Sequence, residues 1–91
     1  MIRREGDRLQ VFGNLTIQTA ATLQQQGIPV DVPALSMDLS GVEAVDSAAV
    51  ALLLGWQRQA QAQGVSLHFE NLPANLLSLA KLYGVAELLP A

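Results

Sequence analysis

The residues that could carry chemistry are few, and their types exclude most reactions. His68 is the single histidine, and the chain has no cysteine, so neither a multi-histidine nor a thiolate metal site can be built. No glycine-rich phosphate loop with a following Lys-Ser/Thr is present. A Ser-His-acid triad could be drawn only from Ser47 and His68, whose strand and helix contexts do not predict convergence. His68 is expected to be a half-exposed strand residue. The sequence therefore predicts no enzyme, no metal site and no cofactor.

One acid–hydroxyl pair occupies a position from which it could bind a partner or a phosphate. Asp46 and Ser47 come before the longest apolar-periodic segment of the chain. Asp46 is expected to cap that helix by accepting hydrogen bonds from its first N–H groups. Ser47 would then lie exposed at the helix start, where it could contact a partner or carry a phosphate. Capping alone would also explain the pair, so both interpretations stay open.

Glycine and proline divide the chain into short elements. The expected strands are a short first strand before a Gly6-Asp7 turn, Arg8 to Phe12, Ala34 to Leu39, and Val65 to Phe69. The expected helices run from Thr16 to about Gln26, from Asp46-Ser47 to about Gln63, and from an Asn71 cap to Tyr83, followed by a short helix at Val85 to Leu89. Ser40-Gly41 is expected to be a turn. The order β-β-α-β-α-β-α predicts one α/β domain over residues 1–91, with a small, mixed but largely parallel sheet and helices packed on it.

The helix after Asp46 carries more apolar surface than one buried face requires. Val50, Leu53 and Leu54 form the face expected to cover the sheet. Leu52 and Trp56 lie to one side of that face, where they are either buried by neighbouring helices or free to contact a partner. Both outcomes are left open by the sequence.

Two further features favour a docking role. Gly55 costs its helix about 1 kcal/mol relative to alanine, which predicts close approach by a bulky group. In the last helix, Leu77 and Leu82 flank the expected buried face of Leu76, Leu79, Ala80 and Tyr83. The two helices together predict an apolar docking patch.

Charge and composition exclude several partners. Hydrophobic residues make up 51% of the chain and charged residues only 14%, against about 25% charged in ordinary domains. Between Arg8 and Arg58 there is no Lys or Arg, so no basic face for nucleic acid or anionic lipid is expected. The apolar run Ala48 to Leu54 is too short to span a bilayer. No apolar stretch follows the first arginines, which predicts a cytoplasmic protein without a signal peptide.

Two segments resemble the signature of STAS domains, named for sulfate transporters and anti-sigma factor antagonists. They are Met37–Val42 (MDLSGV) and Asp46–Leu54 (DSAAVALLL), and the element order matches that fold over essentially the whole chain. Ala51–Trp56 (ALLLGW) and Leu79–Pro90 (LAKLYGVAELLP) look like the MlaB branch. That branch contains the small cytoplasmic subunits of Mla phospholipid ABC transporters.

The resemblance implies a complex in which this chain performs no nucleotide chemistry. The implied partners are an ABC ATPase subunit (MlaF-like), a permease (MlaE-like) and a lipid-binding subunit (MlaD-like), which together maintain outer-membrane lipid asymmetry. The chain would lie at the inner membrane through this complex and support the ATPase. The residues predicted to bind the partner are Asp46, Ser47, Ala48, Ala49, Leu52, Trp56, Leu77 and Leu82.

Two alternatives remain at this stage. One is an anti-sigma factor antagonist that is switched by phosphorylation of Ser47. Ala48 and Ala49 depart from the glycines or Ser-Gly common in such antagonists, which weakens this alternative. The other is direct binding of a lipid or small apolar ligand inside the domain, for which no specific residue argues.

Overall fold

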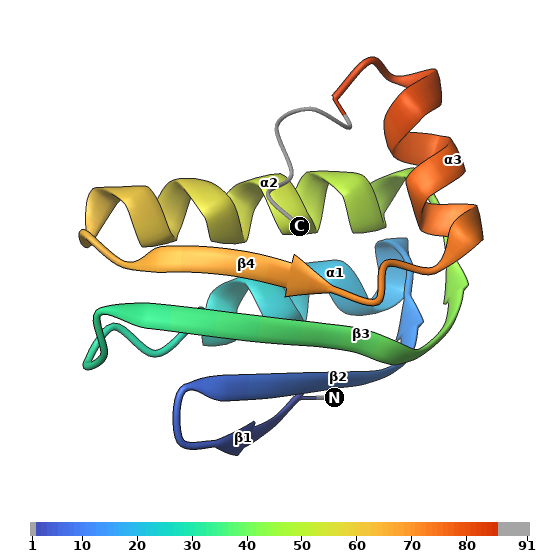
Figure 1. Cartoon of the computed structure of the whole chain (residues 1–91). Coiled ribbons are helices and arrows are strands. Elements are labelled where there is room, and N and C mark those ends of the chain that lie inside the picture. Colours follow the sequence, from blue (N-terminus) through green and yellow to red (C-terminus); the bar gives the residue numbers. More distant parts are fainter. Residues whose placement is uncertain (1, 86–91) are drawn as a thin grey trace.

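The sheet in the computed structural model, which describes residues 2–85, has the strand order β1-β2-β3-β4 (Figure 1). The first two strands pair antiparallel, and the other two are added in parallel. The strands are β1 (Ile2–Glu5), β2 (Arg8–Leu15), β3 (Ala34–Val45) and β4 (Ser66–Glu70), and the helices are α1 (Ile17–Gln26), α2 (Ser47–Ala62) and α3 (Ala74–Leu82). The predicted element order and the mixed, largely parallel sheet are confirmed. The predicted helix at Val85 to Leu89 lies, beyond Val85, outside the described residues.

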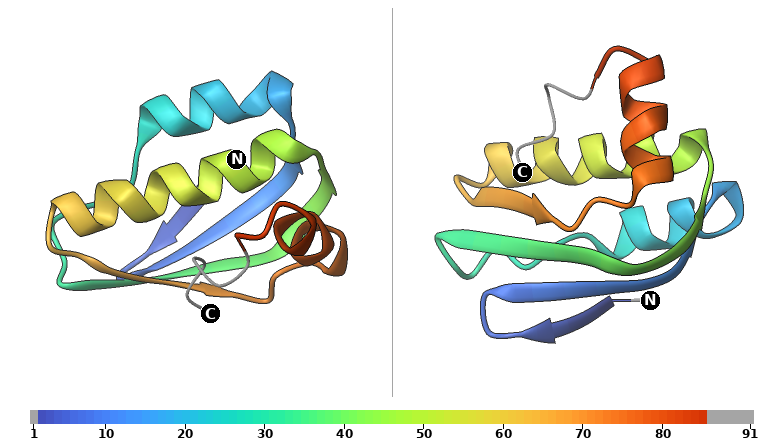
Figure 2. Two further views of the ribbon diagram at one scale, coloured as in Figure 1. Left: turned by 90° about the horizontal axis from the view of Figure 1, so that it is seen from above. Right: turned by 45° about the vertical axis from the view of Figure 1, so that its right-hand side comes forward.

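The helices cover one face of the sheet and leave the other face open. Helices α1 and α2 lie side by side over one face, and α3 crosses near the start of α2 (Figure 2). The β-strand alternation sends apolar side chains to the covered face, where they are buried. These side chains are Leu9, Val11, Leu35, Met37, Leu39, Leu67 and Phe69. The open face carries polar residues, among them the exposed Ser66 and His68.

Strand β3 continues without interruption through the predicted turn. Gln10 pairs with Asp38, but the next pair is Phe12 with Gly41, so β3 uses one residue more than β2 over this stretch. This extra residue is a β-bulge, which bends a strand without ending it. The prediction of a turn at Ser40-Gly41 was therefore wrong. Because β3 continues, β2 also extends past Phe12 to Leu15.

Helix α2 is rotated from the predicted orientation. Its most buried side chains are Ala49, Leu53, Trp56 and Ala60, each 0% exposed. The centre of this stripe lies about 80° from the centre of the predicted face, at 100° per residue. Leu54, predicted to cover the sheet, is only half-buried. The rotation occurs because α2 is packed by α1 and α3 on its flanks as well as by the sheet below it.

Gly55 lies under the α1 helix, as a close approach requires. A Cβ atom at Gly55 would lie 2.8 Å from Cδ of the Gln24 side chain. The prediction that something bulky approaches Gly55 is confirmed, and the group belongs to this chain. Gly55 therefore serves the packing of α1 on α2.

The start of α3 differs from the prediction. Asn71 does not cap the helix; its backbone has a φ of +56°, and Pro73 occupies the N-cap position. The Asn71 side chain instead donates a hydrogen bond to Asp38 on β3. A short polar side chain tolerates the left-handed conformation better than most residues do. Asn71 thus links the β4–α3 connection to the sheet.

Candidate functional site

Asp46 ties the starts of two helices together. Its Oδ1 accepts from the Ala48 N–H of α2 at 2.8 Å, and its Oδ2 accepts from the Ile17 N–H of α1 at 3.0 Å. The predicted cap on α2 is confirmed. The second bond could not be read from the sequence, because Ile17 lies 29 residues away. One carboxylate thus satisfies an unpaired N–H in each helix and places two positive dipole ends side by side.

Thr19 closes the first turn of α1. Its Oγ1 accepts from the Thr16 N–H at 3.1 Å and donates to the Asn14 carbonyl at 2.8 Å. Thr16 holds the predicted N-cap position. The start of α1 is therefore fixed from both sides, by Thr19 within the helix and by Asp46 from its neighbour.

Three of the predicted partner-binding residues are sealed in the core. Ala49 and Trp56 are 0% exposed and Leu52 is 2% exposed. The expectation that Leu52 and Trp56 offer spare surface was wrong, because both side chains are buried within the domain. Side chains buried to this degree contact no partner without unfolding part of the domain.

The other predicted positions stay accessible to differing degrees. Ser47 is exposed, and Asp46, Ala48 and Leu77 are half-buried. Leu82 is 76% exposed on α3. Their role in binding a partner remains a prediction.

A different set of side chains surrounds Ser47. Ile17 is 75% exposed at the start of α1, and Tyr83 is 54% exposed after α3. Ala51 is exposed one turn after Ser47 on the outward side of α2. We call Ile17, Ser47, Ala48, Ala51 and Tyr83 the helix-start surface.

Two shallow hollows join the parts of the helix-start surface. The hollow between α1 and α2, about 240 Å³, includes Ile17, Ala48 and Ala51 in its lining. The groove between α2 and α3, about 340 Å³, includes Ser47, Ala51 and Tyr83. Ala51 lines both hollows. The sequence signal that was missed is that Ala51 lies almost opposite Leu53 on the helical wheel, 200° away at 100° per residue.

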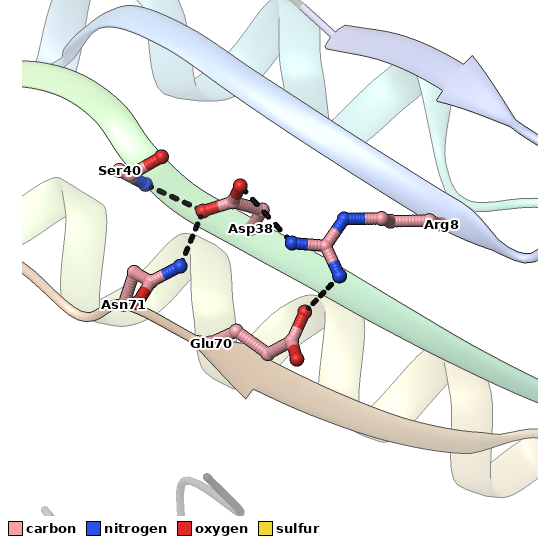
Figure 3. Close-up of polar contacts among 5 residues, drawn as sticks. All are labelled: Arg8, Asp38, Ser40, Glu70 and Asn71. Carbon is pink, nitrogen blue, oxygen red and sulfur yellow. Dashed lines mark hydrogen bonds and ion pairs between the residues drawn. The ribbon is translucent and has the colours of Figure 1, made fainter.

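A second polar cluster lies on the open face of the sheet. In Figure 3 its side chains lie on the near side of the sheet, with the helices behind. Asp38 is only 8% exposed and accepts from the Ser40 N–H at 2.9 Å, the Asn71 amide at 3.0 Å and Arg8 at 3.2 Å. Arg8 also pairs with Glu70 at 2.7 Å.

This cluster stabilises a charged carboxylate. The Asn71 amide, followed by the Ser40 backbone N–H, holds the pKa of Asp38 well below its ordinary value, with Arg8 adding to the effect and burial opposing it. A carboxylate with three donors is a weak base, so it is unsuited to proton transfer at neutral pH. The cluster links β2, β3 and β4 to the start of α3.

His68 and Ser47 do not meet. His68 is exposed on the open face, where its Nε2 lies 3.5 Å from Ser66 Oγ. Ser47 begins α2 on the covered side of the sheet. The expectation that they form no triad agrees with this placement. Within residues 2–85 no group of three His, Cys, Asp or Glu side chains could hold a metal ion.

The architecture defines the class of protein. The chain superposes on a sulfate transporter family protein from Wolinella succinogenes with a TM-score of 0.72 and 16% identity, covering 91% of this chain and 70% of that one. It superposes equally on the anti-sigma factor antagonist SpoIIAA in its unphosphorylated form, with a TM-score of 0.71, 16% identity, and 96% and 82% coverage. Mglu matches with a TM-score of 0.64 and 23% identity over 85% of this chain and 20% of that one. These likenesses show a STAS fold.

The family follows from the sequence itself. The family model described as "Mlab, STAS domain" matches residues 1–90. The chain belongs to this family of STAS domains, whose members are generally non-catalytic regulatory or binding domains. No curated protein matches the sequence. None of the helices within residues 2–85 is long and apolar enough to cross a lipid bilayer.

Proposed function

We propose that this chain is a non-catalytic subunit that docks on the ATPase of a phospholipid-transporting ABC complex. It binds through the helix-start surface at the cytoplasmic side of the inner membrane, and supports the maintenance of outer-membrane lipid asymmetry. The family description favours this role over other STAS functions. The permease and the lipid-binding subunit complete the proposed complex.

The observation that carries the proposal is the character of the helix-start surface. Ile17 and Tyr83 are large, apolar and more than half exposed. Between them Ser47, Ala48 and Ala51 leave the α2 backbone open to close approach. A surface with apolar side chains at its rims and small residues between them is better suited to burial against a protein partner than to exposure to water.

The desolvation cost of docking on the helix-start surface is low. Asp46 is the acidic group nearest the centre, and both of its carboxylate oxygens already accept hydrogen bonds. Polar groups that keep their bonds lose little when a partner excludes water. Ser47 is left to make one polar contact with the partner.

The surface is also rigid before it binds. Asp46 fixes the relative position of the starts of α1 and α2. The Gln24 side chain of α1 also packs on Gly55 of α2. A preorganised surface loses less conformational entropy on association. Docking then shifts the ATPase towards a competent arrangement if that arrangement binds this surface more tightly.

The test compares two alanines of α2. Ala51 and Ala62 are both exposed and lie eleven residues apart, which places them on nearly the same helix face about 16 Å apart. Ala51→Arg sets a charge in the proposed contact and is expected to reduce co-purification with the ATPase at least tenfold. Ala62→Arg is the matched control and is expected to leave it unchanged. Equal retention of both variants, with normal lipid transport, would show that α2 does not dock this way.

A second function, a phosphorylation switch, is favoured by one observation. Ser47 is exposed at a helix start, and the fold matches that of an anti-sigma factor antagonist. Against it, the Asp46 carboxylate already occupies the Ala48 N–H and would repel a phosphate on Ser47. Intact mass of the protein from its native cells separates the two functions: stoichiometric phosphate on Ser47 supports the switch, and unmodified protein bound to the ATPase supports the subunit.

A further inference from the structure

The charged side chains are divided unequally between the helices and the sheet. Over their described ranges the helices α1, α2 and α3 contain no aspartate or glutamate, and they carry two cations, Arg58 and Lys81. The three other cations of the chain, Arg3, Arg4 and Arg8, each pair with a carboxylate of the same chain. Within residues 2–85 the two helix cations are therefore the ones that lie outside any ion pair.

Arg58 lies on the same side of α2 as the helix-start surface. It is exposed and comes seven residues after Ala51. At 100° and 1.5 Å per residue, the two positions differ by about 20° in direction and lie about 10 Å apart along the helix. Leu54, one turn before Arg58, is half-buried and lies on the same side of α2. Arg58 therefore continues the helix-start surface towards the C-terminal half of α2.

Helix stability does not account for an arginine at position 58. A cation strengthens a helix when an acid lies three or four residues away, or when it stands in the last turn beside the negative dipole end. The residues at these spacings are uncharged, and they are Leu54, Gly55, Gln61 and Ala62. The last turn of α2 contains no basic residue, so Arg58 lies before it. The charge of Arg58 is thus available to another molecule.

The surroundings of Arg58 favour a protein partner over a membrane surface. Adhesion to anionic lipid requires a cluster of basic residues, and Arg58 is the single cation of α2. Lys81 does not add to the same patch, because it lies about 200° around the helix from Tyr83, which lines the groove against α2. A single cation next to apolar and small side chains matches a protein surface on which an acid borders apolar groups.

We propose, building on the function proposed above, that the ATPase meets Arg58 with the carboxylate of an aspartate or glutamate. This acid lies about 10 Å from the apolar side chains that contact Ile17 and Ala51. On a partner helix that follows α2, this distance corresponds to seven residues. A guanidinium binds a carboxylate through two parallel hydrogen bonds, which fixes the direction of docking along α2. Ala62 lies one turn beyond Arg58, and an arginine there has the same sign as Arg58, so Ala62→Arg does not repel this acid.

Binding of the full chain to the purified ATPase subunit tests the contact by charge reversal. Arg58→Glu is expected to weaken the affinity at least about tenfold at about 50 mM KCl, and Arg58→Gln about threefold. Raising KCl to about 300 mM should weaken wild type more than Arg58→Gln, because salt screens a charge pair. Arg3→Glu is the matched control, since it changes the net charge equally. Arg3 pairs with Gln10, whose other neighbour Asp38 lies on the open face. Arg3→Glu should bind within about twofold of wild type.

A charge swap identifies the partner residue. Acids of the ATPase are replaced one at a time by arginine, and one replacement should restore binding to Arg58→Glu while weakening binding to wild type. Failure of every replacement to restore binding overturns the proposal. Arg58→Glu should shift Tm by less than about 3 °C, because Arg58 is exposed and makes no ion pair within residues 2–85. A larger shift would show that Arg58 serves the fold, which also overturns the proposal.

The remaining outcomes separate this contact from the docking surface itself. If Ala51→Arg abolishes binding and Arg58→Glu binds like wild type, the docking surface stands and the acidic contact is refuted. If neither variant weakens binding, both are refuted. Equal losses for Arg3→Glu and Arg58→Glu would show an effect of net charge alone, against the proposal. Flotation with vesicles of phosphatidylethanolamine and phosphatidylglycerol should recover neither wild type nor Arg58→Glu. Recovery of wild type alone would assign Arg58 to lipid phosphate and refute the protein contact.

Discussion

Replacing Asp46 is expected to weaken two helices at once. Asp46→Ala removes the acceptor for the Ala48 N–H in α2 and for the Ile17 N–H in α1. Loss of one capping acceptor costs about 1 kcal/mol, with a range of about 0.5–2. The expected loss in free energy of unfolding is therefore about 2 kcal/mol, or a Tm decrease of about 8–16 °C in a domain of this size.

Asp46→Asn separates the two bonds. An amide offers one oxygen where the carboxylate offers two, so only one helix start keeps its acceptor. The expected loss is about 1 kcal/mol, half that of Asp46→Ala. Amide hydrogen exchange should then show one of the two N–H groups, Ile17 or Ala48, losing protection while the other keeps it.

Urea unfolding of the variants provides the measurement, and an exposed acid provides the control. Asp31 pairs with Arg4 at 2.9 Å, and the two side chains are 67% and 41% exposed. Asp31→Ala is expected to cost at most about 0.5 kcal/mol, because exposed ion pairs are weak. The account of Asp46 as a double cap would be refuted if Asp46→Ala cost no more than Asp31→Ala, or if Asp46→Asn were as stable as wild type.

Two other predictions concern the sheet. Because the folded-state pKa of Asp38 lies below its ordinary value of 3.8, its contribution to stability is present above that pH and is lost as the pH falls below it. Urea titrations from pH 7 down to about pH 2 should show that Asp38→Asn is less stable than wild type at pH 7 but loses less stability in acid. Parallel losses of stability in the two proteins would contradict this. Gly41→Ala would set a Cβ 2.7 Å from the Phe12 ring and 3.0 Å from the Val11 carbonyl oxygen, so a loss of about 1–3 kcal/mol in urea unfolding is expected. The double variant with Phe12→Ala should show a smaller added cost of the Gly41 change, and full additivity would argue against this contact.

The sequence predicted the order of elements because local chemistry decides it. The alternation around Leu67 and the glycine after each helix needed no knowledge of distant residues. Ser40-Gly41 failed as a turn for the same reason: its residue types suit a turn, yet pairing with β2 made it a bulge. Strand pairing overrode the local preference.

The site was only partly predictable because apolar residues surround α2 on most sides. Periodicity shows that Leu52, Leu53 and Trp56 can be buried, but the neighbouring helices determine which of them are. Packing within the domain buried Leu52 and Trp56 and left Ala51 facing outward. Asp46 was identified because a cap acts within its own helix, whereas its bond to Ile17 and the Asp38–Asn71 bond join residues far apart in the chain.

The bond between Asp46 and Ile17 also constrains when the helix-start surface comes into existence. The two residues are 29 positions apart, and all of β3 must be inserted beside β2 before they can meet. Contacts of this separation form late relative to local helices, since the loop between them must first be closed. A nascent or partly unfolded chain would therefore not present the surface. A protein that binds this surface therefore selects chains that have completed folding, because it assembles only with chains whose sheet is already in register.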